Sequence, residues 1–151
     1  MANHDVIVTG LFDEFMLISQ FEGDDDSSVT GGGLRLGAGS VLTVTVAVDP
    51  AATQVILGRR YDQGLDKERI RVWVEGHYVG DWLDGGRNTA RRWRESTFLL
   101  PPSLTQNRET LTLRFEPISW SGSENVSFSQ LSVLSLHSRV LIYWLPIALR
   151  N

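Results

Sequence analysis

The sequence contains no cysteine and only one lysine, Lys67. The absence of cysteine excludes disulfides and thiolate metal sites, and it leaves the redox compartment of the protein open. Histidine is also scarce, because His4, His77 and His137 stand alone and lack the spacing of metal ligands. We therefore predict no catalytic metal and no cofactor other than a structural ion.

The chain also lacks a long apolar run. A membrane-spanning helix needs about 20 consecutive apolar residues, and no segment reaches that length. The first residues, MANHDVIV, have neither the basic region nor the apolar stretch of a signal peptide. We expect no membrane span and no signal peptide in this chain, which leaves localisation open, including a mature domain cut from a longer secreted protein.

An excess of positive charge is missing as well. Fourteen basic residues against 18 acidic ones leave a net charge of −4, so the composition does not suggest a nucleic-acid partner. A length of 151 residues with 42% hydrophobic content fits one globular domain. We place that domain at residues 1–138, followed by an apolar C-terminal tail at 139–151.

The sequence does contain segments in which apolar and polar residues alternate. Apolar residues occupy every second position in 70–74, 42–48 and 111–115, which is the signature of half-buried strands. The segment Glu75-Gly76-His77 predicts a tight reversal after the first of these. Short strands and turns rich in glycine, aspartate and proline predict an all-β fold. A single jelly-roll or galactose-binding-like β-sandwich is the first choice, and an immunoglobulin-like sandwich is the second.

Other segments are less regular. Residues 13–21 fit either a helical turn or a strand, and the glycines at 31–33 and 37–39 are interpreted as turns. The alternation slips near Gln130, which predicts a bulge or a strand that crosses between sheets. Residues 140–149 are apolar without a period, so they fit a final strand, an interface segment or extra residues. An apolar surface of that size would promote self-association.

Two arginines interrupt an otherwise apolar strand. Arg59 continues the face of Val55 and Leu57, and Arg60 continues the face of Ile56. Whichever face points inward, one guanidinium lies near the core, where it needs an ionic partner. We expect that partner to be Asp62, Glu95 or Glu116.

One acidic loop is a candidate metal site. Asp24, Asp25 and Asp26 are consecutive, and hard cations bind clustered carboxylates. The loop lacks the spaced acids and the central glycine of an EF-hand. A solvated turn is the simpler interpretation, with a structural calcium ion as the alternative.

An ordered series of motifs resembles a known family. It consists of Gly58–Gly64, Val72–Trp82, Asn88, Arg92–Phe98 and Leu100–Pro101. The series, within residues 40–136, is similar to the β-sandwich region of bacterial double-jelly-roll glycoside hydrolases and of related carbohydrate-binding accessory domains. The resemblance implies a jelly-roll or galactose-binding-like fold, a carbohydrate ligand and assembly into oligomers. It carries no catalytic pair onto this chain.

These observations predict a non-catalytic saccharide site on loops. Aromatic rings stack on sugars, and planar polar side chains bind vicinal hydroxyls. The residues of that composition are Arg60, Asp62, Gln63, Trp82, Asn88, Arg92 and Trp93. Trp82 or Trp93 would cover the ring, Arg92 and Asp62 would bind hydroxyls, and Asn88 would fix orientation. The two tryptophans fit equally well as core or rim residues that cover an edge of the sandwich. The alternatives are a structural domain that forms homo-oligomers through the C-terminal tail, and a glycoside hydrolase subunit.

Overall fold

The computed structural model describes residues 5–23, 27–118, 125–136 and 141–147, without the side chains of 141–144. These residues form antiparallel strands and one short helix, α1 (Pro102–Thr105). The strands are β1 (Asp5–Thr9), β2 (Phe12–Ser19), β3 (Val29–Leu36), β4 (Val41–Ala47), β5 (Gln54–Asp62), β6 (Glu68–Val74), β7 (His77–Asp84), β8 (Trp93–Leu99), β9 (Thr110–Pro117), β10 (Val126–Phe128), β11 (Gln130–Leu136) and β12 (Leu141–Pro146). Residues 13–21 are therefore mostly strand. The prediction of an all-β jelly-roll sandwich is confirmed.

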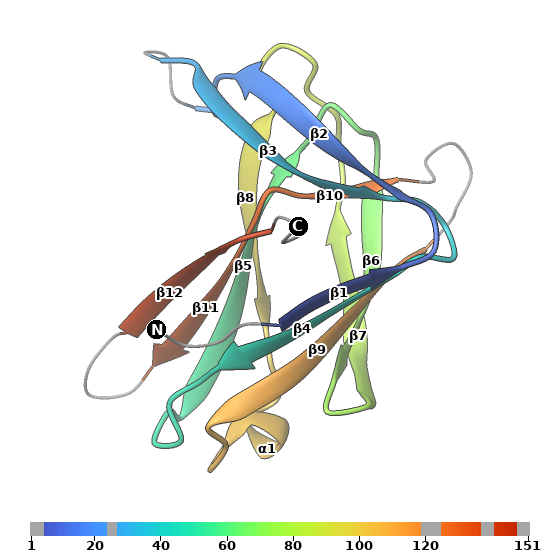
Figure 1. Ribbon diagram of the computed structural model, residues 1–151. Coiled ribbons are helices and arrows are strands. Elements are labelled where there is room, and N and C mark those ends of the chain that lie inside the picture. The colour runs from blue at the N-terminus through green and yellow to red at the C-terminus, as the bar shows by residue number, and fades with distance from the viewer. Residues whose placement is uncertain (1–4, 24–26, 119–124, 137–140, 148–151) are drawn as a thin grey trace.

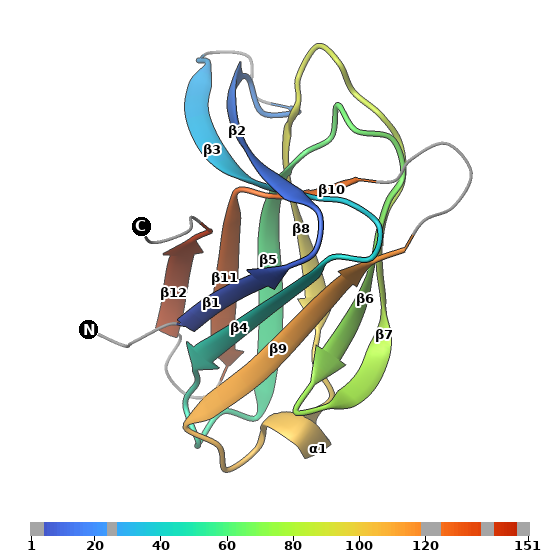
Figure 2. The same ribbon diagram turned by 45° about the vertical axis from the view of Figure 1, so that its right-hand side comes forward.

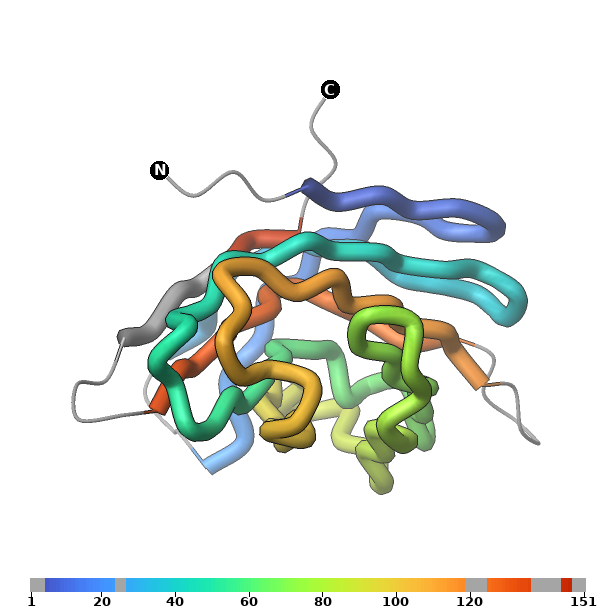
Figure 3. The backbone as a smooth tube through the Cα atoms, turned by 90° about the horizontal axis from the view of Figure 1, so that it is seen from below, coloured from blue at the N-terminus to red at the C-terminus, as the bar shows by residue number. Residues whose placement is uncertain are grey.

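The strands form two layers (Figure 1). One is a five-stranded sheet in the order β1-β4-β9-β6-β7. The other contains the sheet β12-β11-β5-β8 and, at one end, the smaller sheet β10-β3-β2. Figure 2 shows β1, β4 and β9 crossing in front of β11, β5 and β8. The β6–β7 hairpin continues the first layer beside β9, as Figure 3 shows from below.

The predicted hairpin and the predicted slip are both present. β6 and β7 join through Glu75 and Gly76, whose φ angles of 50° and 79° suit a tight hairpin turn. At the slip, β10 pairs with β3, whereas β11 pairs with β5. Ser129 separates the two strands, and its N–H donates to the carbonyl of Arg60 at 2.8 Å. The change of face therefore marks a strand that passes from one sheet to the next.

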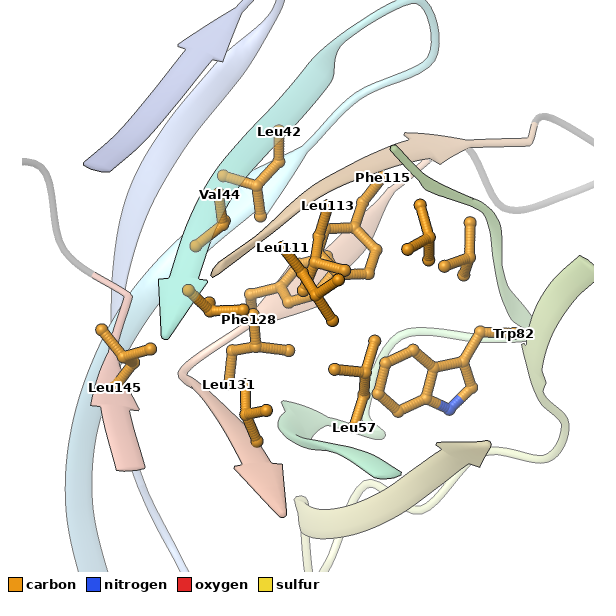
Figure 4. Close-up of a cluster of buried hydrophobic side chains, with 14 of the residues drawn as sticks. Leu42, Val44, Leu57, Trp82, Leu111, Leu113, Phe115, Phe128, Leu131 and Leu145 are labelled. Carbon is orange, nitrogen blue, oxygen red and sulfur yellow. The ribbon is translucent and has the colours of Figure 1, made fainter. Parts of the chain in front are cut away.

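The main core lies between the layers (Figure 4). It is built from the alternating apolar positions that the sequence predicted on 42–48, 70–74 and 111–115. Trp82, Phe115 and Phe128 supply its large rings, with centroids 6.5 Å apart for the first pair and 5.3 Å for the second. Burying large apolar and aromatic side chains of this kind gives the sandwich most of its stability.

The prediction that Gly31, Gly32 and Gly33 form a turn is wrong. They lie inside β3, at positions where other groups approach the backbone of the strand closely. A Cβ on Gly33 would lie 2.0 Å from the carbonyl oxygen of Phe128, and one on Gly31 would lie 3.0 Å from the Trp93 ring. Residues 37–40 do form a turn, in which Gly39 has a φ of 81°.

Trp93 fills a second, smaller core with Phe15 and Leu17, against which Phe21 and Val29 pack. Its side chain is fully buried, and its Nε1–H donates to the carbonyl of Val29 at 2.8 Å. Backbone bonds tie this core to the chain after β2, since Trp93 N–H donates to Gln20 and Glu22 N–H donates to Trp93. The ring therefore joins the β2–β3 hairpin to β8.

The C-terminal segment contributes β12, which pairs with β11 from Leu141 to Pro146. For the described residues 141–146, the structure shows a final strand, so this part of the tail pairs with the sandwich. The calcium candidates Asp24, Asp25 and Asp26 lie outside the described residues.

Replacing Trp93 by alanine should lower the free energy of unfolding by about 3–5 kcal/mol, because it removes a buried indole and strands the carbonyl of Val29. Urea denaturation measures the change. Leu99→Ala on the same strand is the control, since 59% of that side chain is exposed and its loss should cost little. Equal stability of the two variants would show that Trp93 is not a core residue.

Candidate functional site

A buried ionic centre surrounds Arg59, which has no exposed surface. One guanidinium nitrogen donates to Glu68 Oε2 at 2.6 Å and to the carbonyl of Ser127 at 3.0 Å. The other donates to Asp84. Rings of Tyr61, Trp82 and Phe128 enclose the cation, with centroids 4.2, 5.5 and 5.3 Å from its Cζ. Ionic and cation–π contacts together compensate for the lost hydration.

The prediction that an arginine of this strand is buried and paired is confirmed for Arg59, but its predicted partners were wrong. Glu68 and Asp84 lie on β6 and β7, 9 and 25 positions from Arg59 in the sequence, and the packing of the two layers brings them together. Arg60 points to the outer face, where its Nε and Nη2 donate to Glu95 at 3.2 and 3.0 Å. Glu116 pairs instead with Arg71 and Arg114.

The centre holds two carboxylates for one guanidinium. Burial raises the pKa of the Glu68 carboxyl from about 4.5 to about 7, although Arg59 and hydrogen bonds from Ser127 oppose the rise. Burial and the charge of Asp84 likewise raise the pKa of the Tyr61 hydroxyl, so that group stays neutral. Glu68 therefore titrates near neutrality inside the core.

The predicted meeting of three segments is present. The loops over 83–88 and 89–95 contact residues 60–63 at one end of the sandwich, because Gln63 N–H donates to Arg92 O at 2.7 Å and Asn88 N–H donates to Gln63 O at 3.0 Å. Arg92 Nε donates to Asp62 Oδ1 at 2.8 Å, and this hydrogen bond raises the pKa of the guanidinium. The side-chain amide of Gln63 donates to the carbonyl of Arg91 at 2.7 Å.

These polar groups form hydrogen bonds within the protein. Asp62 is fully buried and also accepts the N–H of Gly64, and Gln63 is 4% exposed. Asn88 Oδ1 accepts the N–H groups of Ala90 and Arg91, which shapes the loop. The segment thus closes the end of the sandwich, and its hydroxyl-binding groups mostly bind one another.

The prediction that Trp82 or Trp93 presents a ring to the solvent is wrong. Their exposed fractions are 3% and 0%. Trp82 packs against Phe98 with centroids 5.6 Å apart, and its Nε1–H donates to Ser96 Oγ, which donates in turn to Asp84. Both rings are core residues, because Trp82 packs against Phe98 and Phe115 and Trp93 packs against Phe15 and Phe21.

A shallow surface pocket of about 400 Å³, which we name the Phe21 pocket, lies beside Trp93. Its lining residues are Phe21, Glu22, Trp93, Arg94 and Glu95. Phe21 is half-buried, with its ring centroid 6.5 Å from that of Trp93 and 4.9 Å from the Arg60 guanidinium. The pocket therefore combines an aromatic ring with the partly exposed side chains of Glu22, Arg94 and Glu95, and Arg60 borders it through its contacts with Phe21 and Glu95.

A second depression of about 180 Å³ lies on the outer face of β5, β8 and β11. Glu95 lines both depressions. Gly58 lies in this second depression, beside Thr97 on β8 and Ser132 on β11 in the strand register. We name it the Gly58 trough.

Of the predicted site residues, only Arg60 and Trp93 lie at the Phe21 pocket, and Trp93 lies there as its buried support. Phe21, Glu22, Arg94 and Glu95 were not predicted as a group. Residues 93–95 belong to the Arg92–Phe98 motif, but Phe21 is 72 positions away from Trp93 and pairs with it through an isolated parallel bridge. No sequence pattern indicates such a contact.

Neither a metal cluster nor a membrane helix is present in the part of the chain that the structure describes. Within it, no three histidine, aspartate or glutamate side chains gather to hold an ion. Nor does any helix there have the length and apolar character needed to span a bilayer.

Comparison with known proteins shows a likeness of fold. No family model matches the sequence, and no curated protein matches it. A family 35 carbohydrate-binding module from Clostridium thermocellum aligns with a TM-score of 0.52 and 19% identity over 89% of this chain and 100% of the module. The CBM36-1 domain of a multidomain xylanase from the hindgut metagenome of Trinervitermes trinervoides aligns with a TM-score of 0.50 and 13% identity, over 87% and 96%.

The raised pKa of Glu68 predicts a specific pH dependence. The folded protein holds this proton more tightly than the unfolded chain, so the stabilisation is complete below about pH 4.5 and is lost as the pH rises through about 7. The free energy of unfolding, relative to that of Glu68→Gln, should fall by on the order of 2 kcal/mol between pH 5 and pH 8. Urea titrations of both proteins at the two pH values measure it, and a constant difference would exclude this role for Glu68.

Proposed function

We propose that the chain is a non-catalytic carbohydrate-binding domain whose Phe21 pocket holds one unit of a saccharide. The observation that supports this most directly is a half-buried aromatic ring beside partly exposed guanidinium and carboxylate groups in an open pocket of about 400 Å³. The fold adds support, since it is also the fold of two carbohydrate-binding modules.

The Phe21 ring is positioned to contact the C–H groups of a sugar. Apolar C–H surface packs well against aromatic rings, and a ring that is already held in place loses little entropy when it binds. Trp93 supports Phe21 from the core, and the backbone of Glu22 is bonded to that of Trp93 at 3.1 Å. The ring is therefore ordered before a ligand arrives.

The charged groups around the ring suit hydroxyls. A carboxylate accepts hydrogen bonds from two hydroxyl groups, and a guanidinium group donates hydrogen bonds through N–H groups that lie in one plane. Arg60 pairs with Glu95 at 3.0 Å, and Arg94 lies 3.8 Å from Glu22. Each pair is partly exposed, so a sugar can share its hydrogen bonds without leaving a buried charge unpaired.

Binding without catalysis agrees with the distribution of carboxylates. A glycoside hydrolase needs a carboxylic acid of raised pKa beside the scissile bond. Glu68 has a raised pKa, but it is 1% exposed and lies beneath core rings. The carboxylates that do line the pocket, Glu22 and Glu95, each have an arginine partner.

Replacing Phe21 by alanine should lower the affinity for a saccharide at least tenfold and leave the fold intact, because the ring is only half-buried. We expect a shallow site of this kind to bind with a Kd of about 0.1–1 mM. Affinity electrophoresis against soluble xylan, mannan, β-glucan, arabinan, galactan and inulin measures the effect. Tyr78→Ala is the matched control, since Tyr78 is an exposed aromatic residue on β7. If the polysaccharides retard the two variants equally, or do not retard the natural chain, the proposal is wrong.

A second candidate function is assembly, which a different observation favours. Met16 and Ile18 of β2 are 74% and 70% exposed, and Ile7 of β1 and Leu11 are also largely exposed. Exposed apolar groups in such numbers are typical of interaction surfaces. The homo-oligomer contact predicted for the C-terminal tail would form along β12, which is at the edge of its sheet among the described strands, where a backbone can accept another strand.

If the exposed apolar residues of β2 mediate self-association, the double variant Met16→Glu with Ile18→Glu should shift the protein toward the monomer, because a charge buried in the contact opposes it. Sedimentation equilibrium at several concentrations reports the state. Thr112→Glu on β9 is the control for added exposed charge. A natural chain that is already monomeric at 100 µM, on the order of a weak dimer constant, would remove this candidate.

A further inference from the structure

Three rows of side chains cross the outer face of β8, β5 and β11. The strand register places Glu95, Arg60 and Gln130 in one row, Thr97, Gly58 and Ser132 in the next, and Leu99, Ile56 and Leu134 in the third. The inward positions between them on β5 and β11, such as Leu57 and Val133, belong to the core. The face therefore presents a polar row, a row of small residues and an apolar row side by side.

The row of small residues forms the floor of the Gly58 trough. A Cβ on Gly58 would lie 2.2 Å from Ser132 Oγ, so the Ser132 hydroxyl lies over the Gly58 backbone and forms the floor at this point. A glycine inside a strand weakens the sheet and commonly marks a place where another group approaches the backbone. Here the result is an open depression of about 180 Å³, lined by Glu95 of the polar row on one side and by Ile56 and Leu134 of the apolar row on the other.

The trough continues the Phe21 pocket. Glu95 lines both, and Arg60 joins them, because it contacts the Phe21 ring and bonds to Glu95. A ligand that occupied both depressions would therefore run along β8 and then across β5 toward β11.

We infer that the Gly58 trough is a second sugar subsite and that the ligand is a linear oligosaccharide lying across these strands, rather than a single terminal sugar. The inference rests on the proposed function of the Phe21 pocket. A sugar ring has a C–H face and a rim of hydroxyls, and the two walls match them: Ile56 and Leu134 meet the C–H groups, while Arg60, Glu95 and Gln130 meet the hydroxyls. Two adjoining subsites on one ligand multiply its affinity.

The test compares short and long ligands. Disaccharides and hexasaccharides derived from the six polysaccharides named above are titrated by calorimetry into the natural chain. The hexasaccharide that binds should do so at least tenfold more tightly than its disaccharide, because only it reaches both subsites. Equal affinities of the two lengths would overturn the inference while leaving the proposed function standing. Absence of binding by all twelve would overturn both.

Thr97→Arg fills the trough without touching Phe21, and Thr97→Gln repeats the change without charge. Thr97 is exposed on β8, so neither variant disturbs the core. Both should lower the affinity for the hexasaccharide at least fivefold and leave that for the disaccharide within twofold, whereas Phe21→Ala should lower both. Thr97→Ser and Thr112→Arg serve as controls and should change neither.

Three results would refute the second subsite. One is an unchanged affinity of both Thr97 variants for the hexasaccharide. Another is a parallel loss of disaccharide affinity, which would place Thr97 in the Phe21 pocket itself. The last is a change in sedimentation without a change in sugar affinity, which would make this face a protein contact.

Discussion

The interaction on which the rest of the structure depends is the burial of the Arg59 guanidinium between the two layers. Its partners come from β6, β7 and β10, so the charge is satisfied only when both layers have packed. Removing the guanidinium would leave two carboxylates buried without their cation, which is far more costly than losing an exposed ion pair. The centre therefore favours one arrangement of these strands over other pairings that would bury equally many apolar groups.

The same requirement explains why many polar residues that suit a sugar site serve the fold instead. Asp62 is buried and binds Arg92, and Asp84 binds Arg59 and accepts a hydrogen bond from Ser96. Trp82 is part of the wall around the cation. The groups left for a ligand are those on the outer side of the same strands, since alternation sends Arg60 outward whenever Arg59 points inward. Structure and proposed function thus use opposite faces of β5.

The position of Trp93 links the fold to the candidate site in a second way. Its ring needs the space that Gly31 leaves in β3, and its backbone holds Glu22 beside it. These contacts place Phe21 next to Arg60, although the two residues are far apart in the sequence. A core residue that was expected to bind sugar thereby positions the ring that is proposed to do so.

The sequence by itself determined the class of fold, the β6–β7 hairpin, an irregularity near Gln130 and the need for a buried, paired arginine. All of these follow from local alternation, turn residues and the cost of an unpaired charge, which neighbouring residues reveal. Only the tertiary structure decided the partners of Arg59, the burial of Trp82 and Trp93, the extended conformation of Gly31–Gly33 and the contact between Phe21 and Arg60. Each of these is set by segments that meet across the sandwich, and an alternation pattern specifies which face a residue occupies but not which strand covers that face.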